Sequence, residues 1–392
     1  MLLVKKYGGK TVSTPAQLKQ IAEGLAADHQ KGIQQIVVVS AMGKTTDELI
    51  RLAYEVSPKP DRRELDMLLT TGERVSMALL AMALKDLGVP AISFTGSQAG
   101  IMTDNVHSQA RVIDIKPIRI EQTLKQNQIV TLAGFQGVNP ESKEITTLGR
   151  GGSDTTAVAM AAHFKADRCL ILKDVDGVFS CDPKKVDAVK FRKEISYDSL
   201  VDMCFWGAQF LHFRSAVLAS HYNVPLFIGS ASDPLKGTLV KKGSEMFEIE
   251  KFVAVNGHKK VIRLEASGDG STIIGMLYEI VAKAALPRPQ VLSTGHAGAT
   301  GYAYITTQEE NWISLKEVLK NTSLKIADES LASVSITCSG TVDAQVPSTV
   351  AMCMQKSGIS AEAILFSPLS VSVIVKKSDE DKALKAIHNL VE

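Results

Sequence analysis

The chain has 392 residues, of which 45% are hydrophobic and 22% are charged, and its formal net charge is +2 at pH 7. This length exceeds one typical domain, while the composition is that of an ordinary globular protein. The near-neutral charge excludes a strong general attraction to nucleic acid or membrane, so any anion must be bound at a local site.

The cysteines and the hydropathy of the sequence argue against a secreted protein and against a membrane-spanning one. The five cysteines have neither CxxC nor metal-ligand spacing, and their odd number favours reduced thiols in a cytoplasmic protein. The first residues reach charge and glycine too soon for a secretory signal. Without a run of about 18 uncharged apolar residues, we expect no transmembrane helix.

Short apolar runs alternate with helical periodicity through the first 240 residues. The predicted strands cover 2–4, 36–39, 91–94, 129–133, 169–172 and 226–228, and the predicted helices cover 15–28, 46–55, 62–87 and 156–164. This alternation predicts a mostly parallel sheet with helices on both faces. In such sheets, ligands bind beyond the carboxyl ends of the strands.

A segment with Pro, Gly, Lys and Glu over 235–250 predicts a domain boundary. The later elements are a strand over 252–264, a helix over 271–284, strands over 291–293 and 301–306, a helix over 312–319, a strand over 332–337, a helix over 348–356, a hairpin over 364–376 and a helix over 380–391. The recurring order predicts two small ferredoxin-like units. The predicted domains are therefore 1–240, 250–328 and 329–392.

The most informative motif is Leu148-Gly-Arg-Gly-Gly-Ser-Asp-Thr-Thr156, between a strand and an alanine-rich helix. A glycine-rich turn that opens a helix gathers backbone N–H groups into an anion site. Arg150 could bind a carboxylate or phosphate, and Asp154 could hold an amino group, a metal or a proton. The spacing fits neither a Walker A loop nor a Rossmann fingerprint. The simpler alternative is an ordinary strand-to-helix turn.

Two further clusters follow the first two strands. Lys6-Tyr-Gly-Gly9 joins a lysine to glycines that allow close approach of a phosphate, although this short pattern is weak evidence. Ser40 and Thr46 lie in the run Ser-Ala-Met-Gly-Lys-Thr-Thr-Asp. Taken alone, their hydroxyls are more simply helix-cap and turn groups.

Acidic residues form the last candidates. We expect Glu73 near the start of a helix, where the dipole favours a carboxylate, although a buried acid there could bind a substrate ammonium. The run from Asp174 to Asp182 lacks the ligand spacing of an EF-hand. Contact with a nucleotide and its Mg²⁺ is therefore the favoured reading.

Together these motifs resemble the amino-acid kinase superfamily and, within it, the aspartokinase family. The matching segments are 6–9, 37–49, 71–73, 134–137, 147–157 and 174–178, and the resemblance covers the whole chain. It implies a three-layer α/β sandwich around a mainly parallel sheet, followed by two ferredoxin-like ACT units. It also implies transfer of a phosphoryl group from ATP to L-aspartate with Mg²⁺, giving 4-phospho-L-aspartate, the first step toward lysine, threonine and methionine.

The resemblance also implies roles for single residues. By this resemblance, Lys6 and Asp154 are the expected catalytic residues. Aspartate is bound by Thr46, Glu73, Arg150 and Ser153. The nucleotide site comprises Lys6, Gly8, Gly9, Ser40, Asp174, Phe179, Asp182 and Gln209, with no metal held by the protein alone. The implied partners are L-aspartate, ATP and a second copy of the chain bound through the ACT units, with neither nucleic acid nor membrane.

Four positions depart from the family pattern, one of which is Phe179 in place of a tyrosine. Lys10 and Lys173 replace threonines, and Gln209 replaces a lysine that contacts nucleotide phosphate in relatives. The lost cation could lower activity by orders of magnitude, unless Lys10 or Lys173 restores the charge. The alternative is a catalytically weak relative that serves as a regulatory or binding subunit. A kinase for another small acid, such as glutamate, is a third reading.

The carboxyl-terminal units also depart from relatives that sense lysine or threonine. The expected effector-binding segments read Ser267-Gly-Asp-Gly-Ser271 and Ser367-Pro-Leu-Ser370. Pro368 would remove a backbone donor from the strand expected to hold the effector. We therefore expect weak feedback inhibition or none.

Overall fold

The computed structural model describes residues 1–233, 236–243, 252–284 and 286–391. These residues form two compact units. Unit 1 comprises the described residues of Met1–Val178, Phe191–Cys204 and Gln209–Ser244, and unit 2 those of Phe179–Lys190, Phe205–Ala208 and Glu245–Glu392. Of the boundary predicted over 235–250, residues 236–243 are described and include the strand Gly237–Lys241 of unit 1, and the remaining positions lie outside the described residues.

An eight-stranded sheet forms the centre of unit 1, in the order β12-β14-β13-β9-β1-β2-β6-β3. Its strands are β1 (Leu2–Tyr7), β2 (Gln34–Val39), β3 (Ala91–Phe94), β6 (Ile129–Ala133), β9 (Arg168–Lys173), β12 (Glu194–Ser196), β13 (Leu226–Ser230) and β14 (Gly237–Lys241). Neighbouring strands are parallel throughout, except for the antiparallel pair β13–β14. The predicted mainly parallel sheet is confirmed.

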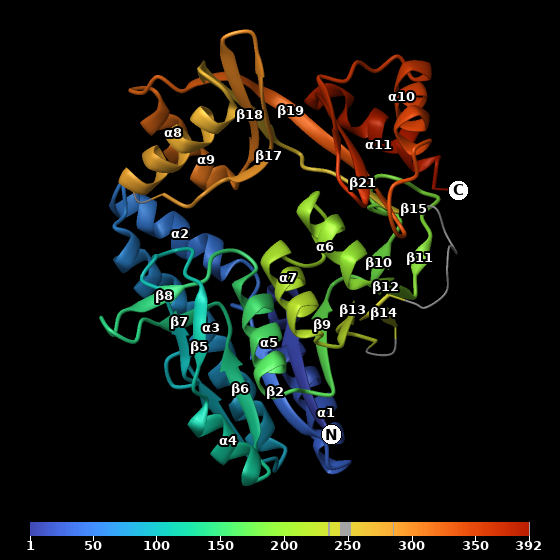
Figure 1. Ribbon diagram of the computed structural model, residues 1–392. Coiled ribbons are helices and arrows are strands. Elements are labelled where there is room, and N and C mark those ends of the chain that lie inside the picture. Colours follow the sequence, from blue (N-terminus) through green and yellow to red (C-terminus); the bar gives the residue numbers. More distant parts are fainter. Residues whose placement is uncertain (234–235, 244–251, 285, 392) are drawn as a thin grey trace. The chain divides into compact units, whose positions relative to one another are not determined.

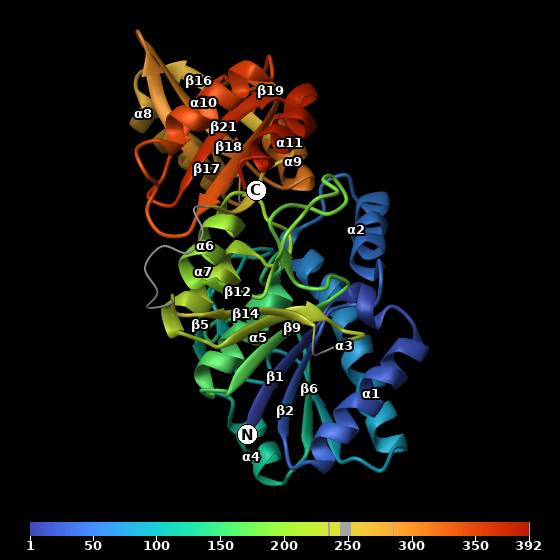
Figure 2. The same ribbon diagram turned by 90° about the vertical axis from the view of Figure 1, so that its right-hand side faces the viewer.

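Helices cover both faces of this sheet, which confirms the three-layer sandwich. Helices α1 (Pro15–Gln30) and α3 (Arg62–Asp86) pack on one face, and α5 (Gly152–His163) with α7 (Phe213–Tyr222) lies on the other, as Figures 1 and 2 show. The remaining helices of this part of the chain are η1 (Gly9–Val12), α2 (Thr45–Val56), α4 (Ile118–Lys125) and α6 (Tyr197–Phe205).

Several short strands escaped the sequence analysis. A four-stranded sheet in the order β5-β4-β7-β8 and a two-stranded pair, β10 and β11, are built from segments of two to four residues. Their bounds are β4 (Ile101–Thr103), β5 (Val112–Ile115), β7 (Gln136–Val138), β8 (Ile145–Thr147), β10 (Val178–Phe179) and β11 (Phe191–Arg192). Segments this short carry too few residues for a period-2 pattern to show.

The predicted position of Glu73 near a helix start was wrong. Helix α3 begins at Arg62, because the side chain of Asp61 accepts hydrogen bonds from the N–H groups of Arg63 and Glu64. Glu73 lies in the interior of this 25-residue helix and faces the core. The helix dipole therefore cannot account for its environment, because the dipole acts only within the first and last turns.

By length and composition, α3 is also the one helix in the described part of the chain that could cross a membrane. Half of its most apolar window is buried within the structure. Its buried leucines and methionine pack against the central sheet, so the core position explains the composition.

Unit 2 contains one seven-stranded antiparallel sheet, in the order β17-β18-β16-β19-β21-β20, with β15 also paired to β19. Its strands are β15 (Phe252–Asn256), β16 (Val261–Ser267), β17 (Gln290–Ala297), β18 (Thr300–Thr306), β19 (Lys325–Cys338), β20 (Ala363–Phe366) and β21 (Ser370–Lys376). The helices are α8 (Gly270–Lys283), α9 (Glu309–Leu319), α10 (Val346–Lys356), η2 (Lys377–Asp379) and α11 (Glu380–His388). Two strand-and-helix clusters fill its core.

Two strands of unit 2 differ from their predicted extents. The single strand predicted over 252–264 is divided into β15 and β16, because Gly257 approaches the backbone so closely that a Cβ there would lie 2.0 Å from the carbonyl oxygen of Ser333. The strand predicted over 332–337 extends over 14 residues as β19. Its first half pairs with β16 and its second half with β21 and β15, so one strand serves both halves of the sheet.

Candidate active site

Two lysines and one aspartate form a buried charged cluster in unit 1. The Nζ atom of Lys6 lies 2.7 Å from Oδ1 of Asp154, and Nζ of Lys173 donates a hydrogen bond of 2.9 Å to Oδ2 of the same carboxylate. The first contact is a buried ion pair. From the sequence, Lys6 and Asp154 were the expected catalytic pair, and Lys173 was named only, with Lys10, as a cation that could restore the charge lost at Gln209.

Burial and charge act in opposite directions on this cluster. Burial lowers the pKa of Lys6, and the charge of Asp154 offsets only part of that effect. Burial would raise the pKa of Asp154, but the charges of Lys173 and Lys6 outweigh it and hold that pKa well below its usual range. Asp154 therefore stays ionised near neutral pH and faces the two ammonium groups as a carboxylate.

The alternation of side chains along β1 brings Lys6 to this cluster. Successive residues of a strand point to opposite faces of its sheet. Lys5 donates to Asp28 on α1 at 2.6 Å and to Gln35 at 2.8 Å, whereas Lys6 meets Asp154 on α5. Each buried lysine thus pairs with an aspartate from the helical layer on its own side of the sheet.

The cluster lies at the carboxyl ends of central strands. Strands β1 and β9 pair with Tyr7 opposite Leu172, so Lys173, the last residue of β9, lies close to Gly8. A Cβ atom at Gly8 would be 3.6 Å from Cγ of Lys173 and 3.7 Å from Nζ of Lys6. The glycine therefore leaves backbone uncovered beside both lysines, as the sequence analysis expected of a phosphate site.

The loops that follow β1 and β2 lie against each other at the carboxyl ends of these strands. The N–H of Ser40 donates to the carbonyl of Tyr7 at 3.2 Å, and a Cβ at Gly9 would lie only 2.8 Å from the carbonyl oxygen of Ala41. Position 9 therefore accepts glycine and little else. Gly8, Gly9 and Ser40 thus lie together at the predicted edge of the sheet.

The simple capping explanation for Ser40 and Thr46 was wrong. The N-cap of α2 is Lys44, and no side chain caps that terminus. The hydroxyl of Thr45 donates to the carbonyl of Met42 at 2.7 Å and so stabilises a turn. The hydroxyls of Ser40 and Thr46 therefore have no capping role in α2.

Glu73 is a buried acid with one unsatisfied oxygen. Its Oε1 accepts a hydrogen bond of 3.1 Å from the N–H of Ala41, whereas Oε2 has no hydrogen-bond partner. Burial raises its pKa to about 7, against the opposing effects of this hydrogen bond and of the charge on Lys6. A buried carboxyl group with a spare acceptor is suited to receive an ammonium group.

The glycine-rich turn before α5 depends on left-handed backbone. Gly149 and Gly151 have φ angles of 75° and 73°, and a Cβ at Gly151 would lie 2.3 Å from Cβ of His212. Gly151 is also the N-cap of α5 and supplies no side-chain cap, and the N–H of Gly152 donates to the carbonyl of Gly149 at 2.9 Å, which closes the turn. Ser153 and Asp154 lie buried in this first turn.

Arg150 extends from the same turn toward α2. Its Nη2 atom lies 3.6 Å from Oδ1 of Asp47, the residue that follows Thr46, and about half of its side chain is exposed (52%). The structure thus brings Arg150 to the helix that carries Thr46. At this distance and exposure, the contact with Asp47 is a weak ion pair.

Two positioning residues of the turn escaped the sequence analysis. Arg214 donates from Nη1 to the carbonyl of Leu148 and from Nη2 to that of Ala110, both at 2.8 Å. Asp66, fully buried on α3, accepts hydrogen bonds from the N–H and hydroxyl of Thr147. A carboxylate two helical turns before Glu73, on the same buried face, was a signal that could have identified Asp66.

The predicted nucleotide residues are more scattered. Asp174 pairs with Lys10 at 2.7 Å on the exposed surface, and Gln209 is exposed on a bend of unit 1. Phe179 and Asp182 belong to unit 2, where Asp182 accepts a hydrogen bond from the N–H of Lys184. The roles assigned to these four residues stay predictions.

The described residues contain no group of three or more His, Cys, Asp or Glu side chains suited to hold a metal ion. Both oxygens of Asp154 already face ammonium groups. This donor set suits Mg²⁺ held mainly by nucleotide phosphates and water, which is how this ion commonly binds in kinases.

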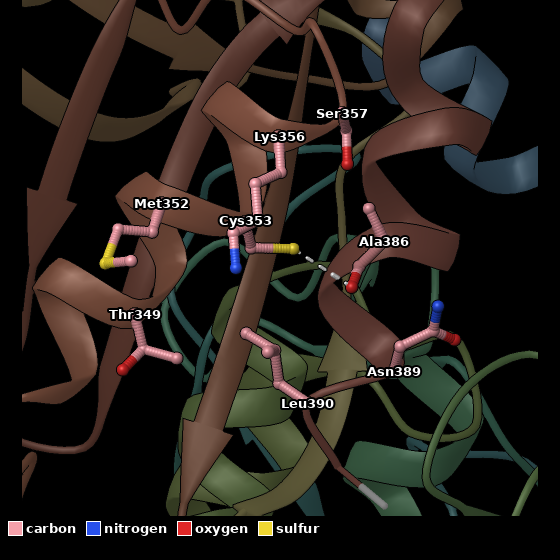
Figure 3. Close-up of a pocket in the computed structure, with 8 residues that line it drawn as sticks. All are labelled: Thr349, Met352, Cys353, Lys356, Ser357, Ala386, Asn389 and Leu390. Carbon is pink, nitrogen blue, oxygen red and sulfur yellow. Dashed lines mark hydrogen bonds between the residues drawn. The ribbon is translucent and has the colours of Figure 1, made fainter.

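A cavity of about 420 Å³ lies in unit 2, between α10 and α11 (Figure 3). Its lining includes Met352, Cys353 and Leu390, and the thiol of Cys353 donates to the carbonyl of Ala386 at 3.1 Å. None of the predicted site residues lines it.

Comparison with known proteins gives a consistent result. Residues 1–230 match the amino acid kinase family. The aspartokinase of Mycolicibacterium smegmatis is 38% identical over 405 residues, covering 99% of this chain and 95% of that protein. Aspartokinase 2 of Bacillus subtilis is 38% identical over 399 residues, covering 100% and 98%.

Solved structures agree. The crystal structure of aspartate kinase from Synechocystis is 32% identical with a TM-score of 0.56, covering all of this chain and 69% of that one. The crystal structure of E. coli aspartokinase III in complex with aspartate and ADP, in its R-state, has a TM-score of 0.82 over 99% of both chains. Its identity is 20%, so this second likeness concerns the fold alone.

Proposed function

Because this chain belongs to the amino acid kinase family and, within it, to the aspartokinases, we propose that the Lys6–Asp154 cluster is its phosphoryl-transfer centre. The enzyme phosphorylates L-aspartate with ATP to give 4-phospho-L-aspartate, the first step toward lysine, threonine and methionine. The observation that carries the assignment of the centre is the buried ion pair at the carboxyl end of β1.

The chemistry needs charge neutralisation more than proton transfer. A side-chain carboxylate oxygen of aspartate attacks the γ-phosphorus of ATP, a new P–O bond forms, and the bond to the bridging oxygen of ADP breaks. Both reactants are anions, so the main obstacle is repulsion, and a fixed cation stabilises the charge on the transferred group. Lys6 supplies that cation, and Asp154 holds it in position.

Binding of aspartate would use the residues on either side of this cluster. The spare Oε2 of Glu73 would accept the substrate ammonium, which would favour the ionised form of a carboxyl group whose pKa is about 7. Arg150 would exchange its weak contact with Asp47 for a substrate carboxylate. Thr46 and Ser153 would complete the aspartate site.

The nucleotide would lie along Gly8, Gly9 and Ser40, where the backbone permits close approach. Mg²⁺ would neutralise part of the phosphate charge and would be held chiefly by the nucleotide. The assignments of Asp174, Phe179, Asp182 and Gln209 to this site rest on the family resemblance.

The alternative of a catalytically weak regulatory subunit has no support. The full-length relatives are aspartokinases, and the two lysines on one buried carboxylate support the proposed centre. We further propose a cytoplasmic enzyme that dimerises through unit 2. Five free cysteines support a reducing compartment, and the edge strands β17 and β20 offer unpaired backbone to a second copy.

One assay tests the proposed centre. ADP release should require L-aspartate, with little release from L-glutamate or without an acceptor, at equal enzyme concentration. Lys6→Ala should lower kcat far more than it changes KM for aspartate, because the charge matters most as the phosphoryl group moves. A folded Lys6→Ala enzyme with normal kcat would show that the centre lies elsewhere.

A further inference from the structure

We propose that Lys173 is a second catalytic cation for the transferred phosphoryl group, acting beside Lys6. This inference rests on the proposed function and adds to it a residue that the resemblance did not assign. Its basis is the arrangement of two ammonium groups on one buried carboxylate.

With both lysines protonated, the cluster carries one net positive charge. The side chains of Lys6 and Asp154 are 6% and 3% exposed, and that of Lys173 is 18% exposed. One carboxylate balances only one of two ammonium groups, and an unbalanced buried charge is unfavourable. The charge of Glu73 also raises the pKa of Lys6, but burial raises the pKa of Glu73 itself to about 7. The substrate ammonium would pair with the ionised form of Glu73. The remaining positive charge therefore favours an anionic ligand.

The position of Lys173 suits a phosphate ligand. Its Cγ and the Nζ of Lys6 both lie within 4 Å of where a Cβ at Gly8 would stand. The uncovered backbone of Gly8 therefore borders both lysines at the carboxyl ends of β1 and β9. Asp154 holds the two ammonium groups through separate oxygens, which fixes them side by side without blocking either approach.

The structure also distinguishes Lys173 from the other departures in sequence. The ammonium of Lys10 is paired with Asp174 on a largely exposed surface, so water screens its charge. Gln209 is exposed on its bend. Of these three residues, only Lys173 places a cation in the buried cluster, where charge is least screened.

A purely structural role makes a different prediction. If Lys173 served only to neutralise Asp154, its loss would lower stability and leave nucleotide affinity unchanged. Lys5 offers a matched control, because it is also a buried lysine on an ion pair, with Asp28 at 2.6 Å, but it faces the opposite layer of the sandwich. Lys5→Met should therefore lower stability without changing kcat by more than about twofold.

The experiment compares wild type, Lys173→Met, Lys5→Met, Gln209→Lys and the double variant Lys173→Met/Gln209→Lys in the full-length chain. Steady-state assays give kcat and KM. Calorimetry gives Kd for ADP and for a non-hydrolysable ATP analogue, each with Mg²⁺. Lys173→Met should lower kcat about 100-fold, as removal of one preorganised donor commonly does, with KM for aspartate within about threefold.

Two further results are expected, one for nucleotide affinity and one for recovery of kcat by a second substitution. Lys173→Met should weaken the ATP analogue about tenfold more than it weakens ADP, because only the analogue carries a γ-phosphate. Gln209→Lys should change wild type little and should raise kcat of the Lys173→Met enzyme about tenfold. If Lys173→Met proves unstable, Lys173→Gln, which can still donate to Asp154, should fold and show the same loss of kcat.

Failure of this proposal differs from failure of the proposed function. Equal losses of ADP and ATP-analogue affinity, or a normal kcat in a folded Lys173 variant, would overturn the role of Lys173 while leaving aspartate phosphorylation intact. An enzyme that releases no ADP with aspartate would refute the proposed function instead. In that case the comparison of the two nucleotides would still decide whether Lys173 meets the γ-phosphate.

Discussion

The carboxylate of Glu73 on α3 accepts the backbone N–H of Ala41 at 3.1 Å, so the long core helix is joined to the loop that follows β2. This contact holds an acid in the core where only one of its oxygens is satisfied. The arrangement disfavours the ionised form of Glu73 in the free enzyme and prepares it for an incoming ammonium group.

A pH dependence of stability follows for Glu73. Its pKa rises from 4.5 to about 7 on folding, so the native state binds a proton more tightly than the unfolded state. The free energy of unfolding should therefore fall by up to about 3 kcal/mol as pH rises through this interval. Glu73→Gln should lack that loss, as denaturant unfolding at pH about 5 and about 8 can measure. Equal pH dependence in both proteins would contradict the assignment.

Arg150→Ala should raise KM for aspartate about tenfold and also lower kcat, because a charge-assisted carboxylate contact both binds and orients the substrate. Steady-state kinetics at saturating ATP measure both constants. Arg51→Ala is the control, since Arg51 is an exposed arginine of α2 paired with Glu55. Unchanged aspartate kinetics in folded Arg150→Ala would remove Arg150 from the site.

Gly151→Ala should destabilise the protein by more than Gly32→Ala does. Both glycines have left-handed backbone, with φ angles of 73° and 76°, so each substitution carries the same conformational penalty of about 1 kcal/mol. Only at Gly151 would the new methyl group also meet His212, at 2.3 Å, whereas nothing lies within 4 Å at Gly32. Thermal unfolding compares the two, and equal losses would mean that His212 moves aside freely.

Inhibition of the full-length enzyme by millimolar lysine or threonine should be weak or absent. The prediction rests on the departure of both expected effector-binding segments from those of relatives that sense lysine or threonine. The expected loss of a strand donor at Pro368 was wrong, because this proline lies in the turn between β20 and β21. The turn is closed by hydrogen bonds between Ser367 and Ser370. Initial rates over a range of each amino acid test the point, and half-inhibition by lysine well below a millimolar would contradict it.

The sequence predicted the sandwich well because each of its central strands contains a short apolar run, such as the one over 36–39 in β2. It predicted β19 poorly for the opposite reason. The first half of that strand, residues 325–330, is polar and partly exposed, so only its buried second half carries an apolar pattern. Tertiary pairing with β16, which includes two register shifts, holds the first half in place.

The residues of the candidate site could be predicted where they belong to a motif of consecutive residues. They could not be predicted where the contact joins residues that are far apart in the sequence. Lys6 and Asp154 were paired through the family resemblance. The contact between Lys173 and Asp154 depends on the register of β9 against β1 and on where α5 crosses them, which no local pattern encodes. Arg214 acts through backbone carbonyls of two distant loops, and such a partner leaves no trace in the sequence, whereas the spacing of Asp66 from Glu73 on α3 was a usable signal.

The continuity of β19 has a consequence for recombination and for chimaera design. A gene crossover at 328/329 would join two strand halves from different parents inside one ladder of backbone hydrogen bonds, with β16 on one half and β21 on the other. Mismatched side-chain alternation at that join would turn core residues toward solvent. Exchanges that carry all of Lys325–Cys338 as one piece should therefore yield folded hybrids far more often than exchanges cut within it.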